Sequence, residues 1–327
     1  MLQMSHNNND ATQKITLKKF TSDFFIKETC PIHRRKKHKN RALSRSYLKS
    51  LRALLDKHIN PVFGNCYVDD IEPKAIDDFI ISMLLNDKYS GRWVNYTLLC
   101  LRLIFTEAER NRLINYNPAK KIQYVKQNTK TKGMLTTAEA NTLMQKEYWQ
   151  NEIFYMFNKT ARYTGMRLGE IAALSTDDIR YENGTHYISV TKSYEFIEGL
   201  KETKTRINRI IPIPEWLAEE LKNFNPGQKY MFSLDGKQPY KKSILSYRFR
   251  DALENIGISD EERRARNITF HSWRHRYISL LNGAISHEQL RLIVGHSQKA
   301  TTNLYTHQII GKATRILSME FFKDIYE

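Results

Sequence analysis

The chain has 327 residues, and its 52 lysines and arginines against 35 aspartates and glutamates give a formal net charge of +17 at pH 7. Hydrophobic residues make up 41% of the chain and aromatic residues 11%, which excludes global disorder, and this length favours two modest domains. No apolar run approaches the roughly 18 residues that cross a bilayer, and the polar first residues resemble neither a secretion signal nor an anchor. We therefore expect a soluble cytoplasmic protein whose excess charge meets nucleic acid.

The cysteines and the paired acids are candidates for metal or redox chemistry. Cys30, Cys66 and Cys100 are odd in number and widely spaced, which favours a reducing compartment without a disulfide framework. Cys30 and His33 have the spacing of metal ligands, but the sequence offers no second pair to complete a four-ligand site, so we do not expect zinc there. Acid pairs at 69–70, 77–78 and 177–178 offer the ligands of a two-metal nuclease, although their positions at the ends of predicted helices suit capping better.

The first part of the chain reads as a polar, flexible tail over residues 1–14 and a helical domain over 15–118. Apolar residues recur at helical spacing from Ser44, Pro73 opens a second helix, and a third helix runs from about Ser90 to about Arg112. Two basic runs without any acid bracket this segment. One such run is commonly a solvated loop, but two runs around one helical segment favour a functional role. The first run comprises Arg34, Arg35, Lys36, Lys37, Lys39, Arg41 and Arg45, and the second adds Lys120, Lys121, Lys126, Lys130 and Lys132 to Arg112.

A linker is expected over residues 119–133, because the stretch 127–133 lacks apolar content. The domain that follows, residues 134–327, reads as mostly helical with one short sheet. Alternating apolar residues predict strands at 186–191 and 207–213, joined by a long polar hairpin. The expected fold is therefore mainly α with a small antiparallel β-sheet, a helical domain followed by a mixed α/β domain. The expected helices of this second domain lie near 137–144, 151–163, 168–174, 215–223 and 241–256, and from about 270 to the C-terminus.

Three short segments of the second domain gather residues that suit phosphate chemistry. The common nucleotide-binding loops, GxxxxGK[ST] and GxGxxG, are absent from the sequence. In TGMRLGE a glycine ends one helix, and an arginine opens the next with a glutamate one turn later. In FHSWRHRY a histidine and an arginine are one helical turn apart, and in GHSQKATTNLYTH a histidine follows a glycine at a helix end. Each residue alone is ordinarily a surface charge, a cap or packing, but they occur together: Arg167 and Glu170, His271 and Arg274, His296 and Tyr305.

Residues 134–327 resemble the catalytic domain of the tyrosine recombinases, the phage-integrase family, and the helical segment before them resembles that family's core-DNA-binding domain. The phrases TGMRLGEIAALSTDDI, HSWRHRY and VGHSQKATTNLYTH stand in the family's order. The 31 residues from Arg274 to Tyr305 and the nine from His296 to Tyr305 also match the family's separations.

The resemblance implies a role for each of these residues in cutting DNA. Arg167 and Arg274 would clamp the phosphate, and Tyr305 would attack it to leave a 3′-phosphotyrosine. The family's lysine lies in the hairpin before a strand ending in Ile-Pro, which selects Lys204, with Lys201 and Lys192 as competitors. This lysine would protonate the leaving 5′-hydroxyl. Further implied roles are proton acceptance for His271, a hydrogen bond to the phosphate for His296, and orientation of the basic groups for Glu170.

The resemblance also implies partners and sets alternatives. The basic runs would close around double-stranded DNA as a clamp, four protomers would assemble at synapsis from free monomers, and accessory factors would set direction. Because the bond energy stays in the protein–DNA linkage, no cofactor, neither ATP nor metal, is expected. The C-terminal helix would pack on its own domain or dock on a neighbour. We favour a mobile-element integrase, and a Xer-type resolvase, a type IB topoisomerase, a metal-dependent nuclease and a non-catalytic regulator remain as alternatives.

Overall fold

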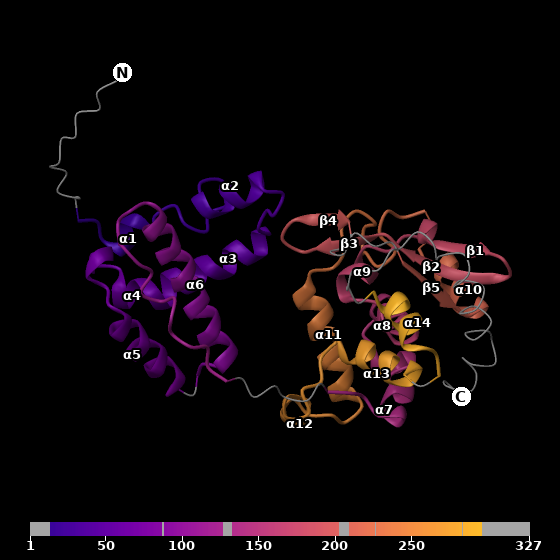
Figure 1. Cartoon of the computed structure of the whole chain (residues 1–327). Coiled ribbons are helices and arrows are strands. Elements are labelled where there is room, and N and C mark those ends of the chain that lie inside the picture. The colour runs from indigo at the N-terminus through magenta and orange to yellow at the C-terminus, as the bar shows by residue number, and fades with distance from the viewer. Residues whose placement is uncertain are drawn as a thin grey trace, which may run out of the picture. The chain divides into compact units, whose positions relative to one another are not determined.

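The computed structural model describes residues 14–86, 88–126, 133–202, 209–225, 227–282 and 284–295. The chain divides into two compact units, Met1–Thr129 and Lys130–Glu327, and each has its own apolar core (Figure 1). Within the described ranges, no helix is both long enough and apolar enough to span a membrane.

The first unit is built from helices whose starts are marked in the sequence. The side chain of Ser44 accepts a hydrogen bond from the backbone of α3, Pro73 occupies the first position of α5, and Ser90 caps α6. Apolar faces of these helices meet in the core, where Leu51 and Leu101 are fully buried. The expected helix starts at Pro73 and Ser90 are thus confirmed. The elements are α1 (Leu17–Phe20), α2 (Pro31–His38), α3 (Arg45–Leu54), η1 (Leu55–Ile59), α4 (Asn60–Phe63), η2 (Val68–Asp70), α5 (Pro73–Leu84) and α6 (Gly91–Arg110).

The segment after α6 is tied back onto that helix. The Asn95 side chain donates to the Val125 carbonyl and accepts from the Val125 amide, both at 2.8 Å. Arg102 donates to the carbonyls of Ala119 and Ile122. Residues 119–126, which belong to the expected linker, therefore lie on the first unit, and the division between the units falls after residue 129.

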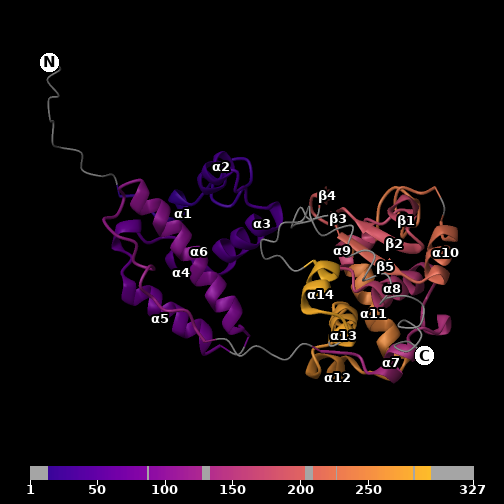
Figure 2. The ribbon, with the colours of Figure 1, turned by 45° about the vertical axis from the view of Figure 1, so that its right-hand side comes forward.

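The second unit surrounds a three-stranded antiparallel sheet of order β1-β2-β5 with helices. Ile188 of β2 stands opposite Ile211 of β5, and both are buried. α10 lies beside β1 and β2, and α13 packs along α8 (Figure 2). The elements are α7 (Thr137–Thr142), η3 (Lys146–Tyr148), α8 (Glu152–Thr164), α9 (Leu168–Ala172), η4 (Thr176–Asp178), β1 (Ile179–Glu182), β2 (Thr185–Val190), β3 (Lys192–Glu195), β4 (Gly199–Glu202), β5 (Arg209–Ile213), α10 (Glu215–Asn223), α11 (Lys242–Asn255), α12 (Asp260–Ala265), α13 (Ser272–Leu281) and α14 (His287–Val294).

The expected fold class, mainly α with a small antiparallel sheet, is confirmed, but β1, β3, β4 and α12 were not expected. β1 buries only Ile179, so it lacks the alternation that marks a strand. β3 and β4 pair as a separate ribbon inside the expected polar hairpin. α12 has no buried residue; the Ser259 cap and the ion pairs of Asp260 stabilise it, and neither produces an apolar period.

Candidate active site

The candidate site begins at the turn between α8 and α9. Gly165 ends α8 in the left-handed conformation, with φ of +58°, and a Cβ at this position would overlap the ring of Tyr277. Arg167 caps α9, and its backbone amide donates to Glu170 Oε2 at 2.8 Å. The Arg-x-x-Glu spacing therefore holds a carboxylate at the first turn of α9, as in a capping box. The turn delivers one arginine and one glutamate to the same place.

The Glu170 carboxylate binds two guanidinium groups. Arg209 donates to both of its oxygens, at 3.0 and 2.6 Å, and Arg167 donates to Oε1 at 2.9 Å. The Glu170 and Arg209 side chains are each 3% exposed, whereas that of Arg167 is 40% exposed. Burial by itself would raise the pKa of the Glu170 carboxyl, but the hydrogen bonds and positive charge of Arg209, and then of Arg167, lower that pKa to about 2. Glu170 is therefore ionised at neutral pH.

A third guanidinium, that of Arg274, lies in the same cluster. It comes from the first turn of α13 and donates to the carbonyls of Gly165, at 2.7 Å, and Val294. Burial, and then the charges of Arg167 and Arg209, lower the pKa of the Arg274 guanidinium to about 9, so it remains charged at pH 7. Three guanidiniums and one carboxylate leave a net charge of 3 − 1 = +2. Such a cluster is suited to binding the oxygens of a phosphate.

His271, expected in the site, is the N-cap of α13 and precedes Arg274 by one helical turn. It is exposed, and its ring lies 4.8 Å from that of His275 in an edge-to-face arrangement. Lys204, His296 and Tyr305 lie outside the described residues.

The two lysines that compete with Lys204 are described, and each has a local partner. Lys192, on β3, donates to Ser175 Oγ at 3.0 Å and pairs with Asp178 at 2.9 Å. Lys201, on β4, pairs with Glu198 across the ribbon turn. The ribbon runs beside α9: a Cβ on residue 169 would lie 2.8 Å from the Ser193 hydroxyl. This places β3 against the helix that Arg167 caps.

Arg209 is the functional candidate that the sequence analysis missed. It is 5% exposed and stands at the start of β5, where residues 209, 211 and 213 are all buried. The missed signal was an arginine on the inward face of an otherwise apolar strand. Burying a charge without a partner is costly, and the carboxylate of Glu170 is the partner of this guanidinium.

The acid pairs serve local structure. Asp178 accepts from the backbone and side chain of Ser175, Asp70 pairs with Lys14, and Asp78 pairs with Lys74. Within the described ranges, no three histidine, cysteine, aspartate or glutamate side chains come together as a metal site would require.

The basic runs differ in how their members are engaged. Arg35 forms a bidentate ion pair with the buried carboxylate of Glu107, at 2.7 and 2.6 Å. Lys36 is half-buried, and Lys130 and Lys132 lie outside the described residues. The remaining members are exposed on the first unit: Arg34, Lys37, Lys39, Arg41, Arg45, Arg112, Lys120, Lys121 and Lys126.

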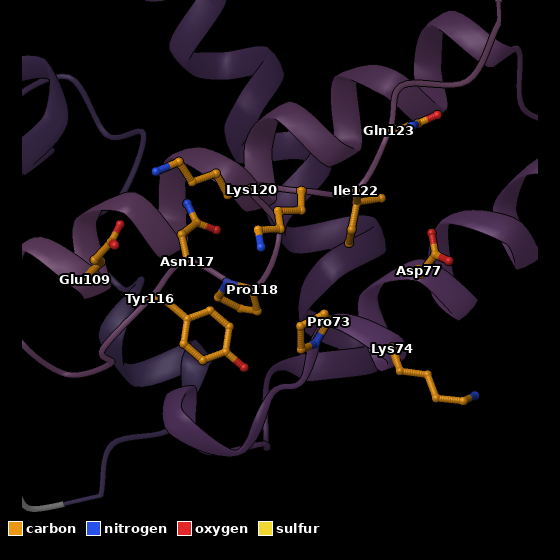
Figure 3. Close-up of a pocket in the computed structure, with 11 residues that line it drawn as sticks. Pro73, Lys74, Asp77, Glu109, Tyr116, Asn117, Pro118, Lys120, Ile122 and Gln123 are labelled. Atoms are coloured by element: carbon orange, nitrogen blue, oxygen red, sulfur yellow. The ribbon is translucent and has the colours of Figure 1, made fainter.

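Lys120 and Lys121 also line a hollow of about 870 Å³ on the first unit (Figure 3). Its walls include the apolar surfaces of Tyr116 and Pro118, one further lysine and two acids. This mixed charge sets the hollow apart from the stretch 34–45, which contains no acid.

Comparison with known proteins gives the class. A model of the phage integrase family matches residues 121–310, and one of the phage integrase N-terminal SAM-like domain matches residues 36–84. The first match covers more than half of the chain, so the chain belongs to the phage integrase family and is a tyrosine recombinase.

Individual relatives extend over most of the chain. The ICEBs1 integrase of Bacillus subtilis (strain 168) is 22% identical over 280 residues, which cover 80% of this chain and 74% of that protein. Among solved structures, the Tn1549 transposon integrase in complex with a circular intermediate DNA has a TM-score of 0.66 at 18% identity, over 92% of this chain and 99% of that one. A lambda integrase tetramer bound to a Holliday junction has a TM-score of 0.65 at 18% identity, over 87% and 78%. These two likenesses show the fold.

Proposed function

We propose that this protein is a site-specific recombinase that integrates and excises a mobile element. It would cut and rejoin DNA through a 3′-phosphotyrosine intermediate and a Holliday junction. The observation that carries the proposal is the cluster of Arg167, Glu170 and Arg274 at the end of α14, which lies one residue before His296 in the chain. The names of the relatives, an ICEBs1 integrase and a Tn1549 transposon integrase, support the mobile element.

In the proposed reaction, Arg167 and Arg274 hold the non-bridging oxygens of the scissile phosphate. Negative charge builds on these oxygens as phosphorus becomes five-coordinate, and fixed guanidiniums stabilise it without reorganising. His296 donates a further hydrogen bond to the phosphate. Glu170 holds Arg167 through its ion pair, and its charge offsets one of the three positive charges of the cluster.

The Tyr305 oxygen forms the new bond to phosphorus, and the bond from phosphorus to the 5′ oxygen breaks. His271 accepts the phenol proton, and Lys204 gives a proton to the departing 5′ oxygen. The phosphotyrosine retains the energy of the broken phosphodiester, so a 5′-hydroxyl from a second strand reverses the step. The reaction therefore needs neither ATP nor a metal ion.

The first unit is proposed as the core-DNA-binding domain and the second as the catalytic domain. The exposed cations of the two basic runs, together with Lys130 and Lys132, would contact the phosphate backbone of double-stranded DNA in a prokaryotic cytoplasm. The lambda integrase tetramer on a Holliday junction supports a homo-tetramer at synapsis, with a free monomer before it. Whether the protein integrates or excises the element would depend on accessory factors.

The proposal is tested by trapping the protein on DNA in the presence of EDTA. Fragments of the chromosomal region that encodes the protein are incubated with it, and covalent adducts are recovered under denaturing conditions and sequenced. We expect a defined site at which nicked duplex traps the wild type, while Tyr305→Phe binds the same duplex without forming an adduct. Cleavage that requires Mg²⁺ and survives Tyr305→Phe would instead indicate a nuclease, and binding without any adduct would indicate a regulator.

The same substrate distinguishes the remaining alternatives and the three lysines. Trapping at a chromosomal dimer-resolution site would favour a Xer-type resolvase, and relaxation of plasmids without a defined site would favour a type IB topoisomerase. Among Lys192→Ala, Lys201→Ala and Lys204→Ala, we expect only the last to abolish cleavage. Substrates whose 5′ oxygen is replaced by sulfur need no proton on leaving and should restore cleavage to that variant.

A further inference from the structure

Three consecutive carbonyl oxygens at the end of α14 accept hydrogen bonds from three different arginines. The carbonyls belong to residues 293–295. Arg209 Nε donates to the Ile293 carbonyl at 2.9 Å. Arg274 donates to the Val294 carbonyl, and Arg167 donates to the Gly295 carbonyl at 3.3 Å. The last carbonyls of a helix lack intrahelical partners, so they are available as acceptors. The end of α14 is therefore bonded to all three guanidiniums of the cluster, two of which also bind Glu170.

Among these three arginines, Arg209 makes the most extensive contacts within the cluster. Its two terminal nitrogens donate to both oxygens of Glu170, and its Nε donates to the Ile293 carbonyl. Its backbone is fixed opposite Val190 in the antiparallel pairing of β2 and β5. Gly295 packs directly on the Arg209 side chain, since a Cβ there would lie 3.1 Å from Arg209 Cδ. Arg209 thus joins the sheet, the first turn of α9 and the end of α14.

These contacts also determine which hydrogen bonds the Arg167 guanidinium makes within the cluster. Because Arg209 occupies both carboxylate oxygens, the Arg167 guanidinium shares only Oε1 and makes one longer bond to the Gly295 carbonyl. Within the described residues, these two side-chain bonds use two of the five N–H groups of its guanidinium. The Arg167 side chain is 40% exposed, so a phosphate can reach it from solvent.

We infer that Arg209 is a positioning residue of the phosphate site, holding Glu170 and the end of α14 in register so that Arg167 and Arg274 meet the phosphate already aligned. The inference rests on the proposed function. It gives a reason for a buried ion pair, since apolar residues of similar volume are often at least as stabilising in such a place. It also connects the arginines to the point from which the chain leads to His296 and Tyr305.

The test compares Arg209→Met, Glu170→Gln and the double variant on the nicked duplex that traps the wild type. DNA affinity should stay within about twofold. The single-turnover rate of adduct formation should fall about 10- to 100-fold for each single variant, because a misplaced catalytic group costs about this much. If Arg209 acts through Glu170, the double variant should be no slower than the slower single variant.

The matched control is Arg162→Met. Arg162 is 3% exposed and donates to Ala140 and Asn141 of α7. Arg162→Met should lower the melting temperature yet keep the cleavage rate within about twofold of the wild type. In the double variant with Glu170→Gln, the fold-changes in cleavage rate of the two single variants should multiply.

A wild-type rate of cleavage by folded Arg209→Met would overturn the inference. So would a double variant whose rate falls by the product of the two single fold-reductions. Should Arg209→Met not fold, Arg209→Lys takes its place, because it keeps the charge and loses the fork. Arg209→Lys is expected to be about tenfold slower and again non-multiplicative with Glu170→Gln, and a wild-type rate would overturn the inference. An absence of adduct in the wild type would refute the proposed function instead.

Discussion

Replacing Glu170 by glutamine should make the second unit less stable, and the loss should depend on pH. The pKa of the folded carboxyl is about 2 against an ordinary 4.5, and each pKa unit corresponds to about 1.4 kcal/mol of differential stability. The difference, 4.5 − 2, gives about 3 kcal/mol. Because the folded pKa is the lower one, this stability is fully present above pH 4.5 and is lost as the pH falls toward 2. Between pH 6.5 and pH 3 about 2 kcal/mol of it should disappear.

The measurement is urea unfolding of wild type and Glu170→Gln at pH 6.5, 5, 4 and 3. Hydrogen exchange of α8 peptides restricts the signal to the second unit. We expect Glu170→Gln to be less stable by about 3 kcal/mol at pH 6.5, and the gap to narrow by about 2 kcal/mol at pH 3. The control is Glu220→Gln, whose carboxylate is 43% exposed and pairs with Lys159, and it should cost less than about 1 kcal/mol at each pH. A Glu170→Gln protein as stable as the wild type, or a gap that does not narrow, would refute the account of the cluster.

Three further outcomes are expected. In urea titration, Gly165→Ala should lower the free energy of unfolding by about 2 to 4 kcal/mol, because the backbone there is strained for alanine and the new Cβ overlaps a buried ring. The control Gly184→Ala also has positive φ but open space around it, and it should cost only about 1 kcal/mol. Arg35→Gln should destabilise the first unit by about 3 kcal/mol because it leaves a buried carboxylate unpaired, while Lys37→Gln should leave stability unchanged and reduce the log–log salt slope of DNA binding by about 0.9. A thiol reagent should label Cys66 rapidly in the folded protein, because the other two cysteines are buried; fast labelling of all three would contradict the packing of the first unit.

The parts of the site that the sequence predicts are those set by local spacing. Gly165 ends a helix, and the next helix begins at Arg167 with Glu170 three residues later, so neighbouring residues alone bring the arginine and the carboxylate together. His271 and Arg274 are likewise one turn apart at the start of α13. These positions needed no knowledge of the tertiary structure.

The parts that the sequence did not predict depend on contacts between distant segments. The pairing of Arg209 with Glu170 joins residues 39 apart, and a charged residue in a strand gives no indication of its partner. Arg35 stood in a basic run, and its pairing with Glu107, 72 residues away, separates it from neighbours that are exposed. Composition identified the charge, but only the packing separates a buried ion pair such as that of Arg35 from cations on the surface.

The central claim is that Tyr305 becomes joined to a 3′ phosphate. Mass spectrometry of the nuclease-digested adduct measures this directly, together with kinase labelling of the released strand. We expect a peptide containing Tyr305 with a nucleotide attached through its 3′ phosphate, and a released end with a free 5′-hydroxyl that the kinase labels. A nucleotide on any other residue, or attachment through a 5′ phosphate, would contradict the account.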